Sequence, residues 1–189
     1  MPIIGKGDIA TVIRDGGLDK DKFTFFCSGV SNSSELRESE YQREIDLLLS
    51  QDRAMHLVYF SSLSIFYANT LYTRHKLFME SLVKSEFPYY TIIRMGNIVW
   101  GEKNPHTLIN FIRNKIRNRE LFEIQDVYRY VIDEEEFLHW INLIPPWPCE
   151  LNIPGRKMKV KDIVKEYCYP WGKSDGTVEH EREMMCSSI

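Results

Sequence analysis

The chain has 189 residues, of which 43% are hydrophobic and 27% are charged, a composition typical of a globular protein with one domain. Its formal net charge is −3 and no block of lysine and arginine stands out, which argues against nucleic-acid binding because such proteins need a basic face to displace counterions. No apolar run approaches the roughly 18–20 residues of a membrane span, and the N-terminus does not resemble a signal peptide, so we expect a cytoplasmic protein without a membrane anchor. The four cysteines contain no CxxC pair, so we expect reduced thiols and no metal site.

The hydrophobic pattern predicts strands that alternate with helices. Apolar runs indicate buried strands at 2–4, 23–27, 57–60 and 90–93. Amphipathic spacing predicts helices at 9–13, 40–50, 72–86, 107–118, 134–143 and 161–167. This alternation is typical of an α/β fold with a mainly parallel sheet and helices on both faces. We expect one domain over 1–173, with small substrate-side elements near its C-terminal end, followed by a polar tail over 174–189.

Glycine and polar residues recur where the expected strands end. In parallel sheets, ligands bind beyond the carboxyl ends of the strands, so this recurrence predicts a single site. The alternative is that strand-to-helix turns use glycine and serine for conformational reasons alone. The residues concerned are Gly5, Gly7, Ser28, Gly29, Ser61, Ser62 and Asn97.

The segment from Ser61 to Lys76 contains the candidate catalytic residues. Tyr72 and Lys76 are four positions apart on an expected helix, so their side chains share one face. A cation near a phenol favours the phenolate, and a serine hydroxyl at a strand end can bind the reacting oxygen, which together make a proton-transfer unit for a carbonyl or alcohol. Tyr-x-x-x-Lys also occurs by chance in many helices, and that alternative stays open here.

Six segments in order resemble the extended short-chain dehydrogenase/reductase family, the NAD-dependent epimerases and dehydratases of nucleotide sugars. They are FTFFCSG, LVYFSSLSIF, YTRHKLFMESLV, TIIRMGNIVWG, VYRYVIDEEEF and LNIPGRKMKVKDIVKEY. The resemblance implies a Rossmann-like sheet that binds NAD or NADP. It also implies that Ser62 is catalytic, that Tyr72 is the acid/base, and that Lys76 binds ribose and tunes Tyr72. By the same resemblance, Asn97 lies near substrate and nicotinamide, and Arg129 faces the nucleotide sugar.

The N-terminal part departs from the family pattern. GKGDIA resembles a phosphate-binding glycine turn, but only twelve residues separate Ala10 from Phe23, where the family fits two more strands and a helix. One of those strands normally ends in the acidic residue that holds the adenosine ribose. We therefore expect a fold truncated at the adenine-side half and weak dinucleotide binding. The expected cofactor-binding residues are Gly5, Lys6, Gly7, Ser28, Gly29 and Lys76.

Two functional hypotheses follow. The first is an NAD(P)-dependent enzyme that acts on a nucleotide sugar, and the alternative is a catalytically silent relative that binds a nucleotide or sugar or serves as an assembly partner. The resemblance also implies a homodimer through the helices at 40–50 and 72–86, with Leu48, Phe78 and Leu82 as candidates for the apolar seam, although a hidden core would explain the same pattern. His75 is expected to face solvent or a neighbouring helix.

Overall fold

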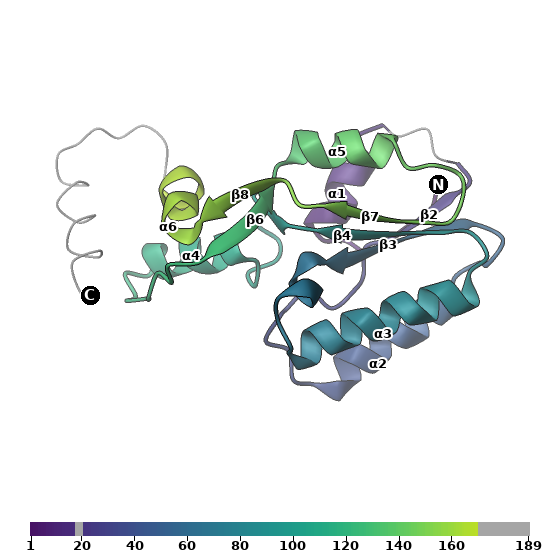
Figure 1. Cartoon of the computed structure of the whole chain (residues 1–189), viewed down its shortest axis with the longest axis horizontal. Coiled ribbons are helices and arrows are strands. Elements are labelled where there is room, and N and C mark those ends of the chain that lie inside the picture. The colour runs from purple at the N-terminus through teal and green to yellow at the C-terminus, as the bar shows by residue number, and fades with distance from the viewer. Residues whose placement is uncertain (18–20, 170–189) are drawn as a thin grey trace.

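The computed structural model describes residues 1–17 and 21–169, so the predicted tail at 174–189 lies outside the described residues. Five parallel strands form the main sheet, in the order β1-β2-β3-β4-β7 (Figure 1). Their bounds are β1 (Ile3–Ile4), β2 (Phe23–Phe26), β3 (His56–Ser62), β4 (Tyr90–Met95) and β7 (Cys149–Ile153). The predicted mainly parallel sheet is confirmed.

Helices cover both faces of this sheet (Figure 1). Side chains alternate along β3, so Val58 and Phe60 pack with α1 and α5 on one face, whereas Leu57 and Tyr59 pack with α2 and α3 on the other. This alternation explains why the strand reads as a continuous apolar run. The Rossmann-like α/β fold is therefore confirmed. The helices are α1 (Asp8–Asp15), α2 (Glu38–Leu49), α3 (Leu71–Glu86) and α5 (Glu134–Asn142).

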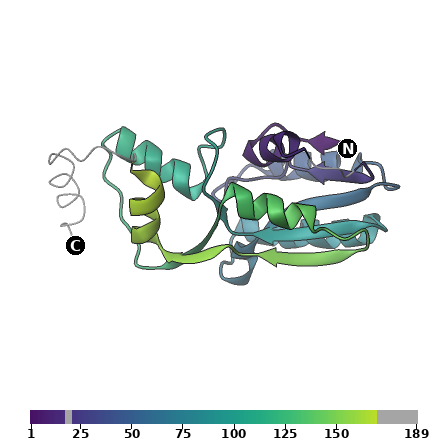
Figure 2. The ribbon, with the colours of Figure 1, turned by 90° about the horizontal axis from the view of Figure 1, so that it is seen from above.

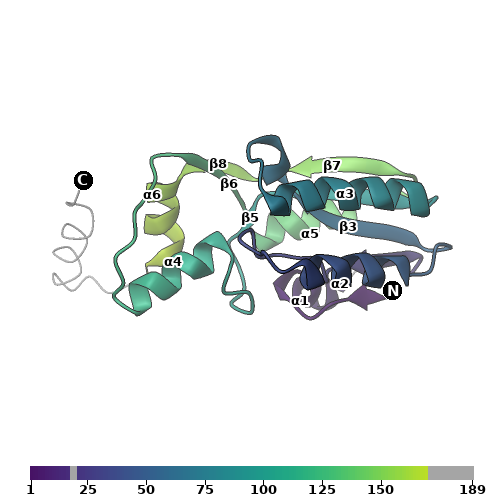
Figure 3. The same ribbon diagram turned by 90° about the horizontal axis from the view of Figure 1, so that it is seen from below.

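A smaller three-stranded sheet, in the order β5-β6-β8, lies at one end of the main sheet with its own apolar core (Figures 2 and 3). The hydrophobic pattern predicts no strand where its last strand, β8, lies. Gly155 turns the chain with φ +66°, and the following residues pair antiparallel with β6. The elements are β5 (Asn97–Ile98), α4 (Leu108–Arg117), β6 (Tyr128–Ile132), β8 (Arg156–Lys159), α6 (Val160–Ile163) and the π-helical turn η2 (Val164–Cys168).

The handedness of the connection from β1 to β2 is consistent with the loss of strands next to β1. The crossovers through α1 and through α2 run in the same direction across the sheet but place their helices on opposite faces, so they have opposite hands. Parallel crossovers are right-handed in nearly all proteins. If the crossovers through α2 and α3 are right-handed, the crossover from β1 through α1 to β2 is left-handed. A right-handed crossover through α1 would instead lead to a strand on the opposite side of β1 from β2. In the described residues β1 is the edge strand, and the strands that the resembled family has on that side are missing, as the short connection before Phe23 predicts.

Candidate active site

The pleat of β3 separates the two serines at its carboxyl end. Ser61 is buried and its hydroxyl donates to Glu80 Oε1 at 2.6 Å. Ser62 lies on the opposite face of the strand, half-buried, and its Oγ accepts from the backbone N–H of Ser64 at 3.2 Å, which caps the 3₁₀ turn η1 (Leu63–Phe66). Both hydroxyls have partners within the fold, since Ser62 Oγ also lies 2.8 Å from Ser64 Oγ, but Ser61 is buried whereas Ser62 is half-buried, so Ser62 is the candidate for contact with a ligand.

Tyr72 and Lys76 lie in the first two turns of α3. A capping box between Thr70 and Thr73 fixes where this helix begins. The helical spacing places the Lys76 Nζ 5.7 Å from the centroid of the Tyr72 ring, and Tyr72 is half-buried. Because η1 is a short link between β3 and α3, both residues lie at the same carboxyl edge of the sheet as Ser62.

A buried carboxylate, Glu44 of α2, holds the ammonium group of Lys76. The Lys76 side chain is only 3% exposed, and its Nζ lies 3.1 Å from Glu44 Oε1 and 3.0 Å from the Tyr59 hydroxyl. The same carboxylate accepts from the Tyr59 hydroxyl at 2.7 Å and from the Val30 N–H at 2.6 Å, and Glu44 Oε2 lies 3.0 Å from His75 Nε2. This group, here called the Glu44 network, joins α2, β3, α3 and the turn after β2.

The network keeps Glu44 ionised. Burial alone would raise the pKa of Glu44, but the charge of Lys76 and the hydrogen bonds from His75, Val30 and Tyr59 outweigh it and lower the pKa to about 2. Burial and the adjacent carboxylate raise the pKa of Tyr59 well above its usual value of 10, so this phenol stays protonated. At neutral pH the network therefore holds a carboxylate beside a lysine with no solvent between them.

The sequence reasoning missed Glu44, although a signal was present. Glu44 stands between Tyr41 and Leu48 on the apolar face of the helix expected at 40–50, a position where an unpaired carboxylate would be costly. His75, for which solvent and a neighbouring helix were both open, packs on α2, with its ring 4.5 Å from that of Tyr41. A carboxylate on an apolar stripe predicts a buried cationic partner elsewhere in the chain.

Arg129 packs over the ring of Tyr67, which in turn lies close enough to Tyr72 to be affected by its charge. Its guanidinium stands 5.8 Å from the centroid of the Tyr67 ring and it has no ion pair with a carboxylate within 1–17 and 21–169. Burial raises the pKa of Tyr67, the positive charge of Arg129 opposes that rise, and a phenolate at Tyr72 would add to it. Asn97 uses its amide differently, since Nδ2 donates to the Tyr130 carbonyl at 2.9 Å and ties β5 to β6.

The glycine turn after β1 lies against the end of β2. Gly5 adopts φ +123°, and a Cβ there would lie 2.7 Å from the Cys27 carbonyl oxygen, so only glycine fits. Gly7 precedes α1, and Lys6 between the glycines is exposed. The buried carboxylate of Asp8 accepts from two backbone N–H groups of the loop before α4, so the first turn of α1 already carries an anion of the protein itself.

The turn after β2 contacts the Glu44 network directly. A Cβ at Gly29 would lie 2.7 Å from Glu44 Oε1 and 2.8 Å from Lys76 Nζ, so the backbone of Gly29 covers this ion pair closely. Ser28 is held by Arg43, whose Nη1 donates to the Ser28 carbonyl oxygen at 3.1 Å and to its hydroxyl at 3.3 Å. The structure thus brings Gly29 beside Lys76 and ties Ser28 to Arg43.

The expectation that Leu48 lies in an apolar seam between two chains is wrong. Leu48 is fully buried against the main sheet, since it lies on the face of α2 that packs on β2 and β3. Leu82 is partly buried in the same cluster, whereas Phe78 is 50% exposed on α3. The hidden-core explanation therefore holds for Leu48.

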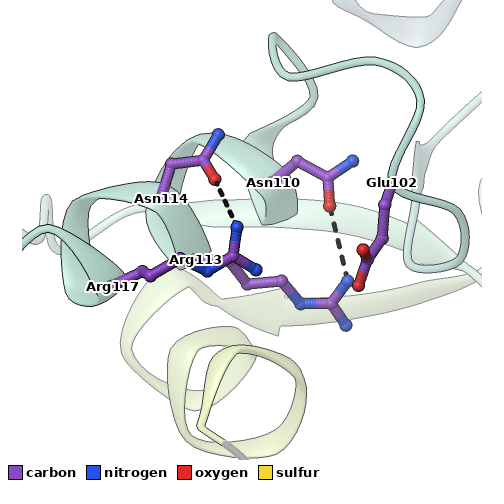
Figure 4. Close-up of a pocket in the computed structure, with 5 residues that line it drawn as sticks. All are labelled: Glu102, Asn110, Arg113, Asn114 and Arg117. Carbon is purple, nitrogen blue, oxygen red and sulfur yellow. Dashed lines mark hydrogen bonds between the residues drawn. The ribbon is translucent and has the colours of Figure 1, made fainter.

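A separate hollow lies on α4, in the part of the protein built on the smaller sheet (Figure 4). Arg113 Nε donates to the Tyr167 carbonyl oxygen at 3.1 Å and Nη1 to Asn110 Oδ1 at 3.4 Å, while Arg117 Nη1 donates to Asn114 Oδ1 at 3.4 Å. Both guanidinium groups therefore already have acceptors within the protein. Glu102 completes the lining.

The described part of the chain contains neither a candidate metal site nor a candidate membrane span. Within 1–17 and 21–169, no group of three or more histidine, cysteine, aspartate or glutamate side chains could hold a metal ion. None of the helices described there has the length and apolar character needed to cross a membrane.

Several solved structures that share this fold are named as nucleotide-sugar epimerases or dehydratases or as complexes with a nucleotide sugar and NAD. MoeE5 in complex with UDP-glucose and NAD matches with a TM-score of 0.61 and 16% identity, over 79% of this chain and 64% of that chain. TunA, an NAD-dependent NDP-hexosamine 5,6-dehydratase, matches with a TM-score of 0.60 and 13% identity, over 76% and 59%. UDP-glucuronic acid 4-epimerase from Bacillus cereus matches with a TM-score of 0.60 and 12% identity, over 79% and 61%.

The described residues therefore share the fold of these proteins, which include a nucleotide-sugar dehydratase and a nucleotide-sugar epimerase. The chain spans less than two thirds of the length of these three structures. No protein-family model matches the sequence, and no curated protein matches it.

Proposed function

We propose that the chain is a shortened NAD(P)-dependent oxidoreductase of the epimerase/dehydratase kind that acts on a nucleotide sugar. The observation that supports this most strongly is the placement of Ser62, Tyr72 and Lys76 at one carboxyl edge of a parallel sheet, with the Lys76 ammonium 5.7 Å from the Tyr72 ring. The matched structures are described as complexes with NAD and UDP sugars, or as an NAD-dependent dehydratase, which supports the same class of chemistry.

In this proposal each residue has a defined task. The nicotinamide supplies the site that accepts and returns a hydride when the cofactor is bound. Tyr72 exchanges the proton of the sugar hydroxyl, and Ser62 holds the same oxygen by a hydrogen bond. Lys76 provides positive charge beside Tyr72. Arg129, which has no carboxylate partner in the described residues, is placed to meet an anionic part of the substrate.

The two halves of a dinucleotide do not fit this chain equally well. On the nicotinamide side, the Gly5 turn lies against the backbone of Cys27 and Ser28, and the backbone of Gly29 lies close to Lys76. On the adenine side, β1 is an edge strand, and the reversal of strand order beside which dinucleotides bind is missing from the described residues. Asp8 adds negative charge at the helix terminus that would face the pyrophosphate. We therefore propose weak dinucleotide binding, with Gly5, Lys6 and Gly7 as the remaining phosphate turn.

The second candidate is a catalytically silent relative that binds a nucleotide or sugar. The Glu44 network favours it, because a carboxylate 3.1 Å from Lys76 compensates the charge that would act on Tyr72. The two proposals are separated by incubating the purified chain with isotopically labelled nicotinamide cofactor and a panel of UDP-, GDP- and dTDP-sugars. Exchange of hydride with one of them supports the enzyme. Binding of a sugar nucleotide without any exchange supports the silent relative.

We also propose that the chain forms a homodimer through α3. Leu77 and Phe78 are 46% and 50% exposed on this helix, which is unusual for such large apolar side chains side by side. Light scattering at micromolar concentration should give twice the chain mass of 22.4 kDa. Phe78→Glu should give the single-chain mass, because it places a charge in the seam, whereas Phe111→Glu on α4 serves as a control of similar exposure. A wild-type mass of 22.4 kDa would rule out the dimer.

A further inference from the structure

The charge of Lys76 is balanced before any ligand binds. Its ammonium group lies 3.1 Å from Glu44 Oε1, and both side chains are almost completely buried. A lysine makes a nearby phenol easier to ionise through its positive field, and an opposite charge at ion-pair distance removes much of that field. Tyr72 therefore experiences the difference between the two charges rather than the full charge of Lys76.

The hydrogen bonds around Glu44 hold this arrangement in place. The carboxylate accepts from Tyr59 and Val30 and contacts His75, so it cannot turn away from Lys76 without breaking contacts to three other elements. Lys76 itself donates to Tyr59 as well as to Glu44, and Gly29 leaves no room for it to move toward the turn after β2. The distance between the two charges is thus set by the fold.

We infer that Glu44 is a positioning residue that sets, through Lys76, how readily Tyr72 gives up its proton. Glu44 and Tyr41 face the site from α2, Tyr59 from β3, Tyr67 from the segment after η1, and His75 and Lys76 from α3. Of these, Glu44 is the group that carries negative charge at neutral pH. The catalytic meaning of the inference rests on the proposed function, but the electrostatic effect is a property of the protein without ligand.

The test is a pH titration of the ligand-free chain labelled with ¹³Cζ-tyrosine and followed by NMR, with the Tyr72 signal assigned by its loss in Tyr72→Phe. Glu44→Gln keeps the shape of the side chain and removes its charge. We expect Tyr72 in this variant to ionise about one pH unit below wild type, a tenfold change in the ionisation constant. An unchanged or higher ionisation pH would overturn the inference.

Two further variants keep the test decisive. Lys76→Met leaves the carboxylate uncompensated and should move the ionisation of Tyr72 to higher pH, and the absence of that move would also overturn the inference. Glu80→Gln is the matched control, since it removes another buried carboxylate of α3, which is paired with Arg94 of β4. Glu80 lies eight residues after Tyr72, or about 12 Å along the helix axis. This variant should leave the titration of Tyr72 within about 0.3 pH units of wild type. Because no cofactor or sugar is present, these results stand whatever the hydride-exchange assay gives.

Discussion

Tyr72→Phe is expected to lower the rate of hydride exchange between about 10²- and 10⁴-fold, the range that positioned proton transfer typically contributes. The substitution removes one hydroxyl oxygen and keeps the aromatic ring that lies 5.7 Å from Lys76 Nζ. Since Tyr72 is only half-buried, the packing of α3 should change little. The rate is measured with labelled nicotinamide at saturating sugar nucleotide, and folding is checked by thermal unfolding of the same samples.

A matched control separates this effect from the general loss of a phenol. Tyr89→Phe removes the hydroxyl of a half-exposed tyrosine before β4, at the opposite edge of the sheet from Ser62. It should exchange hydride at the wild-type rate. If Tyr72→Phe also exchanges at the wild-type rate, another group handles the proton and the assignment of Tyr72 is wrong.

Glu44→Ala is expected to reduce the free energy of unfolding by about 3–5 kcal/mol, the usual cost of removing one partner of a buried ion pair. The variant leaves Lys76 buried without a counter-charge, and it leaves the Val30 N–H without its acceptor. Urea denaturation at pH 7 measures the loss. Glu40→Ala, one turn earlier on α2, removes a carboxylate paired at the surface with Arg43 and should cost less than about 1 kcal/mol. Equal losses in the two variants would contradict the role of Glu44.

The contribution of Glu44 should also depend on pH in a defined direction. The pKa of Glu44 is lowered from about 4.5 to about 2 in the folded chain, so its ionised form stabilises the fold above pH 4.5. This contribution is lost as the pH falls from about 4.5 toward about 2. The difference in unfolding free energy between wild type and Glu44→Ala should therefore shrink across that window and stay constant from pH 5 to 8.

Much of the fold could be predicted because it is determined by patterns among residues that are close together in the sequence. The run 57–60 reads as a strand since both faces of β3 are buried, and the tyrosine and lysine of α3 share a face because helical geometry puts residues four apart together. The short connection before Phe23, compared with the pattern of the family that the chain resembles, predicted the truncation, and β1 is the edge of the sheet in the described residues. These inferences needed only a few neighbouring residues each.

Other features depend on partners far away in the sequence. Glu44 and Lys76 are 32 residues apart, and no local pattern reveals that their side chains meet in the interior. The β8 strand forms because β6 offers an antiparallel partner, although its own residues, RKMK, have little strand character. Leu48 was assigned to a surface seam because an apolar stripe does not state which neighbour covers it.

The most direct test of the account compares reduced nicotinamide mononucleotide with NADH as ligands of the purified chain, by fluorescence titration of the nicotinamide. The proposed function has a nicotinamide-side site beside Lys76, and the described residues carry no strand beyond β1 for an adenosine subsite, so the two ligands should bind with dissociation constants within about tenfold of each other, both weaker than micromolar. Sub-micromolar binding of NADH, about 100-fold or more tighter than that of the mononucleotide, would show that an adenosine subsite exists and would contradict the account.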